Sequence, residues 1–141
     1  MFHSKLVMAA AAASMFIFSA QAETLRFHAT LNGQSEVPPK MTGGAGTVEA
    51  TLDTATRKLD YKATWQGLSG PATMAHFHGP AEPGANAKVA VPWGDNPASP
   101  FTATATLTEA QAADLIAGRW YANVHTAQNP GGEIRGQVTR E

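Results

Sequence analysis

Apolar and polar residues alternate with a period of two along most of the chain after residue 23. In the segment 24–31, for example, every second residue is apolar, so one face of an extended chain is apolar and the other is polar. This pattern is typical of strands that bury one face. Segments of this kind, together with one short apolar run, cover residues 24–31, 47–53, 58–65, 74–78, 88–91, 101–107, 120–126 and 134–138. The sequence therefore predicts six to eight short strands.

Turn and cap signals separate these strands. Residues 54–57 lie between two alternating runs and predict a β-hairpin. Thr108 and Gln111 have the spacing of a capping box, so a helix is predicted to begin there and to end at Gly118. This is the only predicted helix, and the helices that a parallel sheet needs between its strands are missing. We therefore expect an all-β fold, an antiparallel Greek-key-like β-sandwich with one short helix.

The first 22 residues have the pattern of a secretory signal peptide. Lys5 supplies a basic start, an apolar stretch follows, and small residues precede a cleavage site after Ala22. The apolar stretch, about 13 residues, is shorter than the roughly 20 residues that span a bilayer. We therefore expect residues 1–22 to be removed and residues 23–141 to form one exported domain without a membrane span, either periplasmic or extracellular.

Charge and cysteine content narrow the possible functions. The mature chain would carry 9 basic and 11 acidic residues without basic clusters, which argues against nucleic acid and anionic membranes as partners. The chain has no cysteine, so core packing, with or without a metal ion, must stabilise it in place of disulfides. The sequence contains neither the Gly-x-Ser-x-Gly frame of many serine hydrolases nor a glycine loop for phosphates.

Three histidines are predicted to share the polar side of two strands. His76 and His78 lie on one face of the segment 74–78, and His125 lies on the face of the segment 120–126 opposite its apolar residues. Attachment points two residues apart on a strand are roughly 6.5–7 Å apart, so both rings can turn toward one ion at about 2.0 Å. A third ring from an adjacent strand would complete a metal site. Imidazole ligands favour zinc or copper over calcium or magnesium.

Secondary candidates for this site are Met74, Arg135, Glu133 and His28. Met74 lies on the same strand face as the paired histidines and could add a thioether that favours copper, although methionine more often fills a core. His28 is interpreted as a surface residue. Glu133 and Arg135 share a strand face, and a structural ion pair is the preferred interpretation. The alternative to a metal site is a hydrogen-bonded cluster of the three histidines with Asn123, Glu133 and Arg135.

Four segments carry distinctive motifs: LNGQSEVPP at 31–39, AHFHGPA at 75–81, GRWYANVHT at 118–126 and PGGEIRGQ at 130–137. Together they resemble the CHRD family, named for its repeats in chordin. The resemblance covers essentially the whole mature chain, with the motifs in the same order. It implies a secreted all-β module, and in chordin the domain lies in an extracellular protein that antagonises a growth factor.

The histidine arrangement also resembles, more weakly, copper-zinc superoxide dismutase, a β-sandwich in which histidines hold copper. In that resemblance Arg135 would guide anions to the metal, but the zinc-binding His and Asp set and the disulfide cysteines are missing. Three hypotheses follow. The preferred one is a metal-binding module of CHRD type; the others are a copper-dependent redox enzyme and a metal-free module that binds another exported protein. The sequence leaves the oligomeric state open.

Overall fold

Eight antiparallel strands form where the alternating segments predict them, in a computed structural model that describes residues 11–17 and 21–141. The strands are β1 (Thr24–Asn32), β2 (Ala45–Asp53), β3 (Lys58–Gln66), β4 (Ala72–His78), β5 (Val89–Asp95), β6 (Phe101–Thr106), β7 (Trp120–Thr126) and β8 (Ile134–Arg140). A short 3-10 helix, η1 (Gly33–Ser35), follows β1, and one α-helix, α1 (Glu109–Ile116), lies between β6 and β7. The predicted all-β fold and its hairpin are confirmed.

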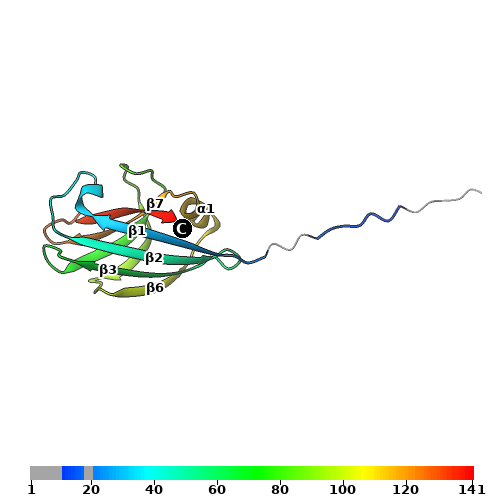
Figure 1. Cartoon of the computed structure of the whole chain (residues 1–141), viewed down its shortest axis with the longest axis horizontal. Helices are drawn as coiled ribbons and strands as arrows, with labels where there is room; N and C mark the ends of the chain where they lie inside the picture. The colour runs from blue at the N-terminus through cyan, green and yellow to red at the C-terminus, as the bar shows by residue number, and fades with distance from the viewer. Residues whose placement is uncertain (1–10, 18–20) are drawn as a thin grey trace, which may run out of the picture.

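The strands form one sheet in the order β5-β4-β7-β8-β1-β2-β3-β6. Pairing between β1 and β8 is interrupted, with partners at Phe27–Arg140 and His28–Thr139 near one end and Asn32–Arg135 at the other. The sheet folds over at this seam, so that β1, β2, β3 and β6 lie side by side as one layer, as Figure 1 shows. The prediction of a sandwich is confirmed, as two layers of a single, nearly closed sheet.

Aromatic side chains fill the space between the two layers. The ring of Tyr61 on β3 meets Phe77 on β4 edge-on at a centroid distance of 5.0 Å. Phe77 also contacts Trp120 on β7 at 5.3 Å. Trp93 on β5 stacks on Phe101 of β6 at 5.6 Å and so joins the two edge strands across the core. Aromatic pairs at such distances stabilise the core beyond the burial of their area.

The boundaries of β5 differ from the prediction. Residues 88–91 were expected to be extended, whereas the strand runs on to Asp95 through Pro92. β5 pairs only with β4, so it is an edge strand and the missing N–H of Pro92 breaks no central ladder. Helix α1 agrees with the prediction: Thr108 and Gln111 form both bonds of a capping box, and Gly118 follows the helix with φ +75°.

Most of the predicted signal peptide, residues 1–10 and 18–20, lies outside the residues that the structure describes. Residues 11–17 are exposed and form no helix or strand. None of the helices in residues 11–17 and 21–141 is long and apolar enough to cross a membrane.

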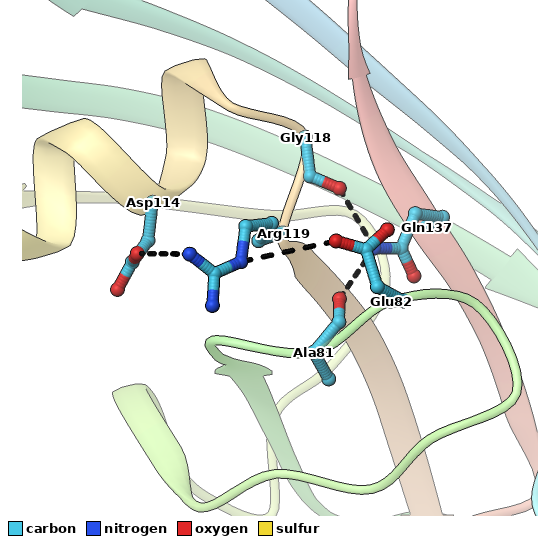
Figure 2. Close-up of polar contacts among 6 residues, drawn as sticks. All are labelled: Ala81, Glu82, Asp114, Gly118, Arg119 and Gln137. Carbon is cyan, nitrogen blue, oxygen red and sulfur yellow. Dashed lines mark hydrogen bonds and ion pairs between the residues drawn. The ribbon is translucent and has the colours of Figure 1, made fainter.

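The loop between β4 and β5 is held against β8 and the end of α1 (Figure 2). The side-chain amide of Gln137 donates to the carbonyl oxygens of Ala81 at 2.9 Å and Gly118 at 2.8 Å. The backbone N–H of Ala81 donates to the carbonyl of Arg119 at 2.8 Å. Arg119 also pairs with Glu82 at 3.9 Å, an exposed contact that contributes little. The hydrogen bonds of the Gln137 side chain and of the Ala81 backbone therefore fix this loop, which covers the polar side of β7.

A buried carboxylate, that of Glu133, ties together three further connections. Glu133 is 0% exposed and accepts hydrogen bonds from the hydroxyls of Thr42 and Thr126, each at 2.8 Å. It also accepts from the backbone N–H of Ser69 at 3.0 Å, from the Ser69 hydroxyl and from the Asn129 amide at 3.0 Å. The predicted ion pair between Glu133 and Arg135 is wrong, because hydroxyl and amide donors already fill the carboxylate.

These donors make Glu133 a determinant of acid stability. Burial by itself raises the pKa of the carboxyl, but the hydrogen bonds from Ser69, Thr126 and Thr42 outweigh it and lower the pKa from 4.5 to about 2. The stabilisation is therefore present above pH 4.5 and is lost as the pH falls toward 2. This difference corresponds to up to about 3 kcal/mol of the free energy of unfolding.

We predict that Glu133→Gln lowers the urea midpoint at neutral pH and flattens its dependence on pH between about 5 and about 2. The exposed Glu49, replaced by Gln, serves as the control and should leave both quantities unchanged. If the urea midpoint fell as steeply with decreasing pH in Glu133→Gln as in the wild type, the role given to Glu133 would be contradicted.

Candidate metal centre

Strands β4 and β7 are neighbours, and their register brings the predicted polar faces together. Met74 lies opposite His125, His76 opposite Asn123, and His78 opposite Tyr121. Residues opposite one another on adjacent strands project from the same side of the sheet. The intervening core residues of both strands are buried between the two layers: Ala75, Phe77, Ala122 and Val124. The predicted parity of both segments is therefore confirmed.

The three histidine rings meet in space. Ring centroids are 4.8 Å apart for His76 and His125, 5.2 Å for His76 and His78, and 6.3 Å for His78 and His125. One nitrogen from each ring lies within 4.8 Å of the others. Two ligands of one ion at about 2.1 Å are at most about 4.2 Å apart, so the widest gap must narrow slightly. His76 is half-buried, and its one side-chain hydrogen bond is to His125, so its ring can make that adjustment.

Backbone carbonyls fix the protonation pattern of two rings. Nδ1 of His78 is 2.9 Å from the carbonyl oxygen of Ala87, and Nδ1 of His125 is 2.8 Å from that of Pro130. A carbonyl oxygen can only accept, so each Nδ1 carries the hydrogen and donates it. In a neutral ring the lone pair then lies on Nε2. This is the second-shell contact that metal-binding histidines usually make.

Both Nε2 lone pairs face the same amide oxygen. Oδ1 of Asn123 is 2.9 Å from Nε2 of His78 and 3.0 Å from Nε2 of His125. Neutral rings held in this tautomer offer that oxygen no hydrogen, so three acceptors converge, and only Nε2 of His125 has another donor nearby, Nδ1 of His76 at 3.1 Å. Exchanging the oxygen and nitrogen positions of the Asn123 side-chain amide would give both Nε2 lone pairs an N–H donor. It would also turn Oδ1 toward Oε1 of Glu36, which now lies 3.5 Å from Nδ2, and two acceptors would face each other unless Glu36 were protonated.

The surroundings keep two of the rings neutral, the form that binds metal ions. Burial, reinforced by the neighbouring His125 and His78, lowers the pKa of His76 to about 4. Burial also lowers the pKa of His78, although hydrogen bonds to Ala87 and Asn123 oppose it. Glu36 is 4% exposed, and burial raises the pKa of its carboxyl to about 6 against the lowering effect of Arg135.

Arg135 supports the site through Tyr121 and makes no hydrogen bond to the three histidines. It is 2% exposed, and its Nη atoms donate to Asn86 Oδ1 at 2.8 Å and to the carbonyl oxygen of Ala85. Its guanidinium carbon lies 3.5 Å from the centre of the Tyr121 ring, and Tyr121 stacks in turn on His78 with ring centroids 4.7 Å apart. Such a guanidinium holds the loop and the stack, and an anion-guiding role does not fit it.

The other secondary candidates lie in different places. Met74 is on the histidine side of β4 and 38% exposed, so its role as a ligand stays a prediction. His28 is exposed on β1, on the far side of the seam from β4, and is not part of the cluster. Glu133 is occupied by its own donors. Among the alternative partners of the histidines, only Asn123 contacts them through a side chain.

Sequence reasoning missed two residues around the centre, Tyr121 as the stacking partner of His78 and Glu36 as the partner of Asn123. The position of Tyr121 two residues before Asn123 on the polar face was a usable signal. For Glu36 the only signal was its place in the LNGQSEVPP segment. The partners are 87 residues apart in sequence, which no local pattern connects.

Within the described residues, the three histidines are the one group of His, Cys, Asp or Glu side chains close enough to hold an ion. A second set for zinc, as in copper-zinc superoxide dismutase, is not seen there. No curated protein and no solved structure matches the chain significantly. The similarity to superoxide dismutase therefore rests on the spacing of the histidines alone.

Comparison with protein families gives a match to the CHRD domain. The profile of the CHRD domain covers residues 27–138, from the first strand to the last, including the histidine cluster and the loops that enclose it. The match extends over well more than half of the chain and agrees with the four motifs in the sequence. The chain therefore belongs to the CHRD domain family.

Proposed function

We propose that this CHRD domain is a binding module for one transition-metal ion, copper or zinc, held by His76, His78 and His125. The observation that carries the proposal is that the Nε2 atoms of His78 and His125 lie 2.9 and 3.0 Å from the same Oδ1 of Asn123, while both Nδ1 hydrogens are committed to carbonyls. A cation at this place would accept the Nε2 lone pairs and relieve the repulsion between these acceptors.

The donor chemistry supports copper or zinc. Three imidazole nitrogens form a borderline-soft set, whereas calcium and magnesium require oxygen ligands. The distance of 3.1 Å between Nδ1 of His76 and Nε2 of His125 is close to the separation of two ligands on one ion. Met74, opposite His125 in the register, is the residue through which the site would favour copper.

A copper-dependent redox enzyme is the second candidate. The half-buried position of His76 and the exposure of Met74 favour it, because they leave one side of the centre open to solvent and to a small substrate. The binding module remains the preferred function, because the nearby cation Arg135 is already bound to Asn86, Ala85 and the face of Tyr121, and Glu36 is separated from the rings by Asn123.

We also propose that the protein is exported. CHRD domains occur in extracellular or periplasmic proteins, and residues 1–22 have the pattern of a cleaved signal. The absence of cysteine suits a domain stabilised by its core and, when loaded, by a metal ion.

The first test is metal binding by protein purified without a histidine tag. We predict that calorimetry shows one zinc or copper ion per chain, with a rise in melting temperature, and that His78→Ala weakens binding by at least about 100-fold. His28→Ala, the matched control on an exposed strand face, should bind as the wild type does. A wild type that neither binds these ions nor gains thermal stability would favour the metal-free, partner-binding module.

The second test examines the ring nitrogens directly. Long-range nitrogen–proton correlation spectra of the metal-free protein should show His78 and His125 as neutral rings protonated at Nδ1, as their carbonyl partners require. Added zinc should shift both Nε2 resonances and leave the Nδ1–H groups in place. Rings protonated at Nε2, or Nε2 signals indifferent to zinc, would speak against the proposed ligand atoms.

The third test separates the module from the enzyme. We expect copper-loaded protein to show no more superoxide turnover than a copper–chelator complex at the same copper concentration. Turnover that is present in the wild type and lost in His78→Ala would establish the redox enzyme in place of the module.

A further inference from the structure

A cavity of about 380 Å³ lies between the segment that follows β1, the loop between β4 and β5, and strand β8. One wall is the segment from Gln34 to Pro39, the other is Pro83 with Gly84, and Arg135 of β8 contributes to the lining. The side-chain amide of Asn86 donates to the carbonyl of Val37 at 3.4 Å and ties the two loops together. The volume is within the range of small-molecule sites.

Two oppositely charged side chains line this cavity without touching each other. Glu36 is 4% exposed and Arg135 is 2% exposed, yet no ion pair within 4.0 Å joins them in the described part of the chain. Buried charges are unfavourable unless a partner compensates them directly. The fold thus places a carboxylate and a guanidinium on the lining of one cavity, where they form no direct ion pair.

Each charged group has hydrogen-bonding capacity left for a ligand. Asn123 at Oε1 is the one side-chain donor to Glu36 among the described residues, and the backbone N–H of Val37 also hydrogen-bonds the carboxyl, so part of the acceptor capacity of its two oxygens is unused. The two Nη atoms of Arg135 bind Asn86 and Ala85, which leaves Nε free. Both side chains are among those that line the cavity.

We propose that this cavity binds a small zwitterion of the amino-acid type, with its ammonium group at Glu36 and its carboxylate at Arg135. A ligand with a single charge would pair one wall and leave the other uncompensated, whereas a zwitterion compensates both. Val37, Pro39 and Pro83 offer apolar surface to the rest of the ligand. The residues that line the cavity are distinct from the three histidines, so a zwitterion can bind whether or not a metal ion is present.

The test is binding of the twenty common L-amino acids, each assayed singly by thermal shift and calorimetry, with acetate and methylammonium as singly charged controls. At least one amino acid should raise the melting temperature and bind in a one-to-one ratio. Glu36→Gln should weaken that binding by about 10-fold or more, because the ammonium loses its charged partner. Glu49→Gln, an exposed acid on β2, should not change it.

Two further measurements keep the result decisive. Glu36→Asp retains the charge with a shorter reach, and it is used if the Gln variant does not fold; it should also weaken binding. The wild-type protein freed of metal with a chelator should still bind the amino acid, so the two proposals can fail separately. No binding by any amino acid, equal binding in Glu36→Gln, or equally tight binding of acetate would overturn the zwitterion site and leave a water-filled cavity.

Discussion

Burial of both faces of β7 is the constraint on which the rest of the structure depends. All seven residues from Trp120 to Thr126 are buried. One face joins the aromatic core, as expected of a sandwich strand. The other face is polar, and polar groups taken out of water must find hydrogen-bond partners. The loops of the domain supply those partners, so hydrogen bonding to the polar face of β7 determines how these loops fold.

Each loop meets that requirement at a particular atom. The connection after β4 brings the carbonyl oxygen of Ala87 to His78, and the turn before β8 brings that of Pro130 to His125. The segment after β1 brings the carboxylate of Glu36 to Asn123. These connections are rich in glycine and proline, as suits chains that must pass close to the sheet and turn sharply. Their irregular course is thus part of the site and not only a link between strands.

The sequence predicted the parts of the fold that depend on neighbouring residues. Period-two alternation located the strands, and the capping box at Thr108 located the helix, because both signals lie within a few residues. The convergence of His76 with His125 followed once β4 and β7 were taken as neighbours. The donors from Thr42 and Ser69 to Glu133 could not be predicted, since they come from loops far away in sequence. The stack of Arg135 on Tyr121 joins the neighbouring strands β8 and β7, and it depends on a register that the sequence did not specify. Charge and spacing alone suggested an ion pair between Glu133 and Arg135. The pair does not form because each side chain is buried and hydrogen-bonds to other groups.

Asn123 links the histidine cluster to the charged cavity lined by Glu36 and Arg135. Its amide oxygen faces the histidines and its amide nitrogen faces Glu36, so the amide dipole points its negative end toward the position of the proposed cation. The carboxylate behind the amide supplies negative charge to a donor set that is otherwise neutral. Arg135 reduces this effect from the other side, but its charge is shared with Asn86, Ala85 and the face of Tyr121. The proposed divalent ion would therefore have a compensating negative charge across a single amide, which gives the buried acid at this position an electrostatic role in the proposed site.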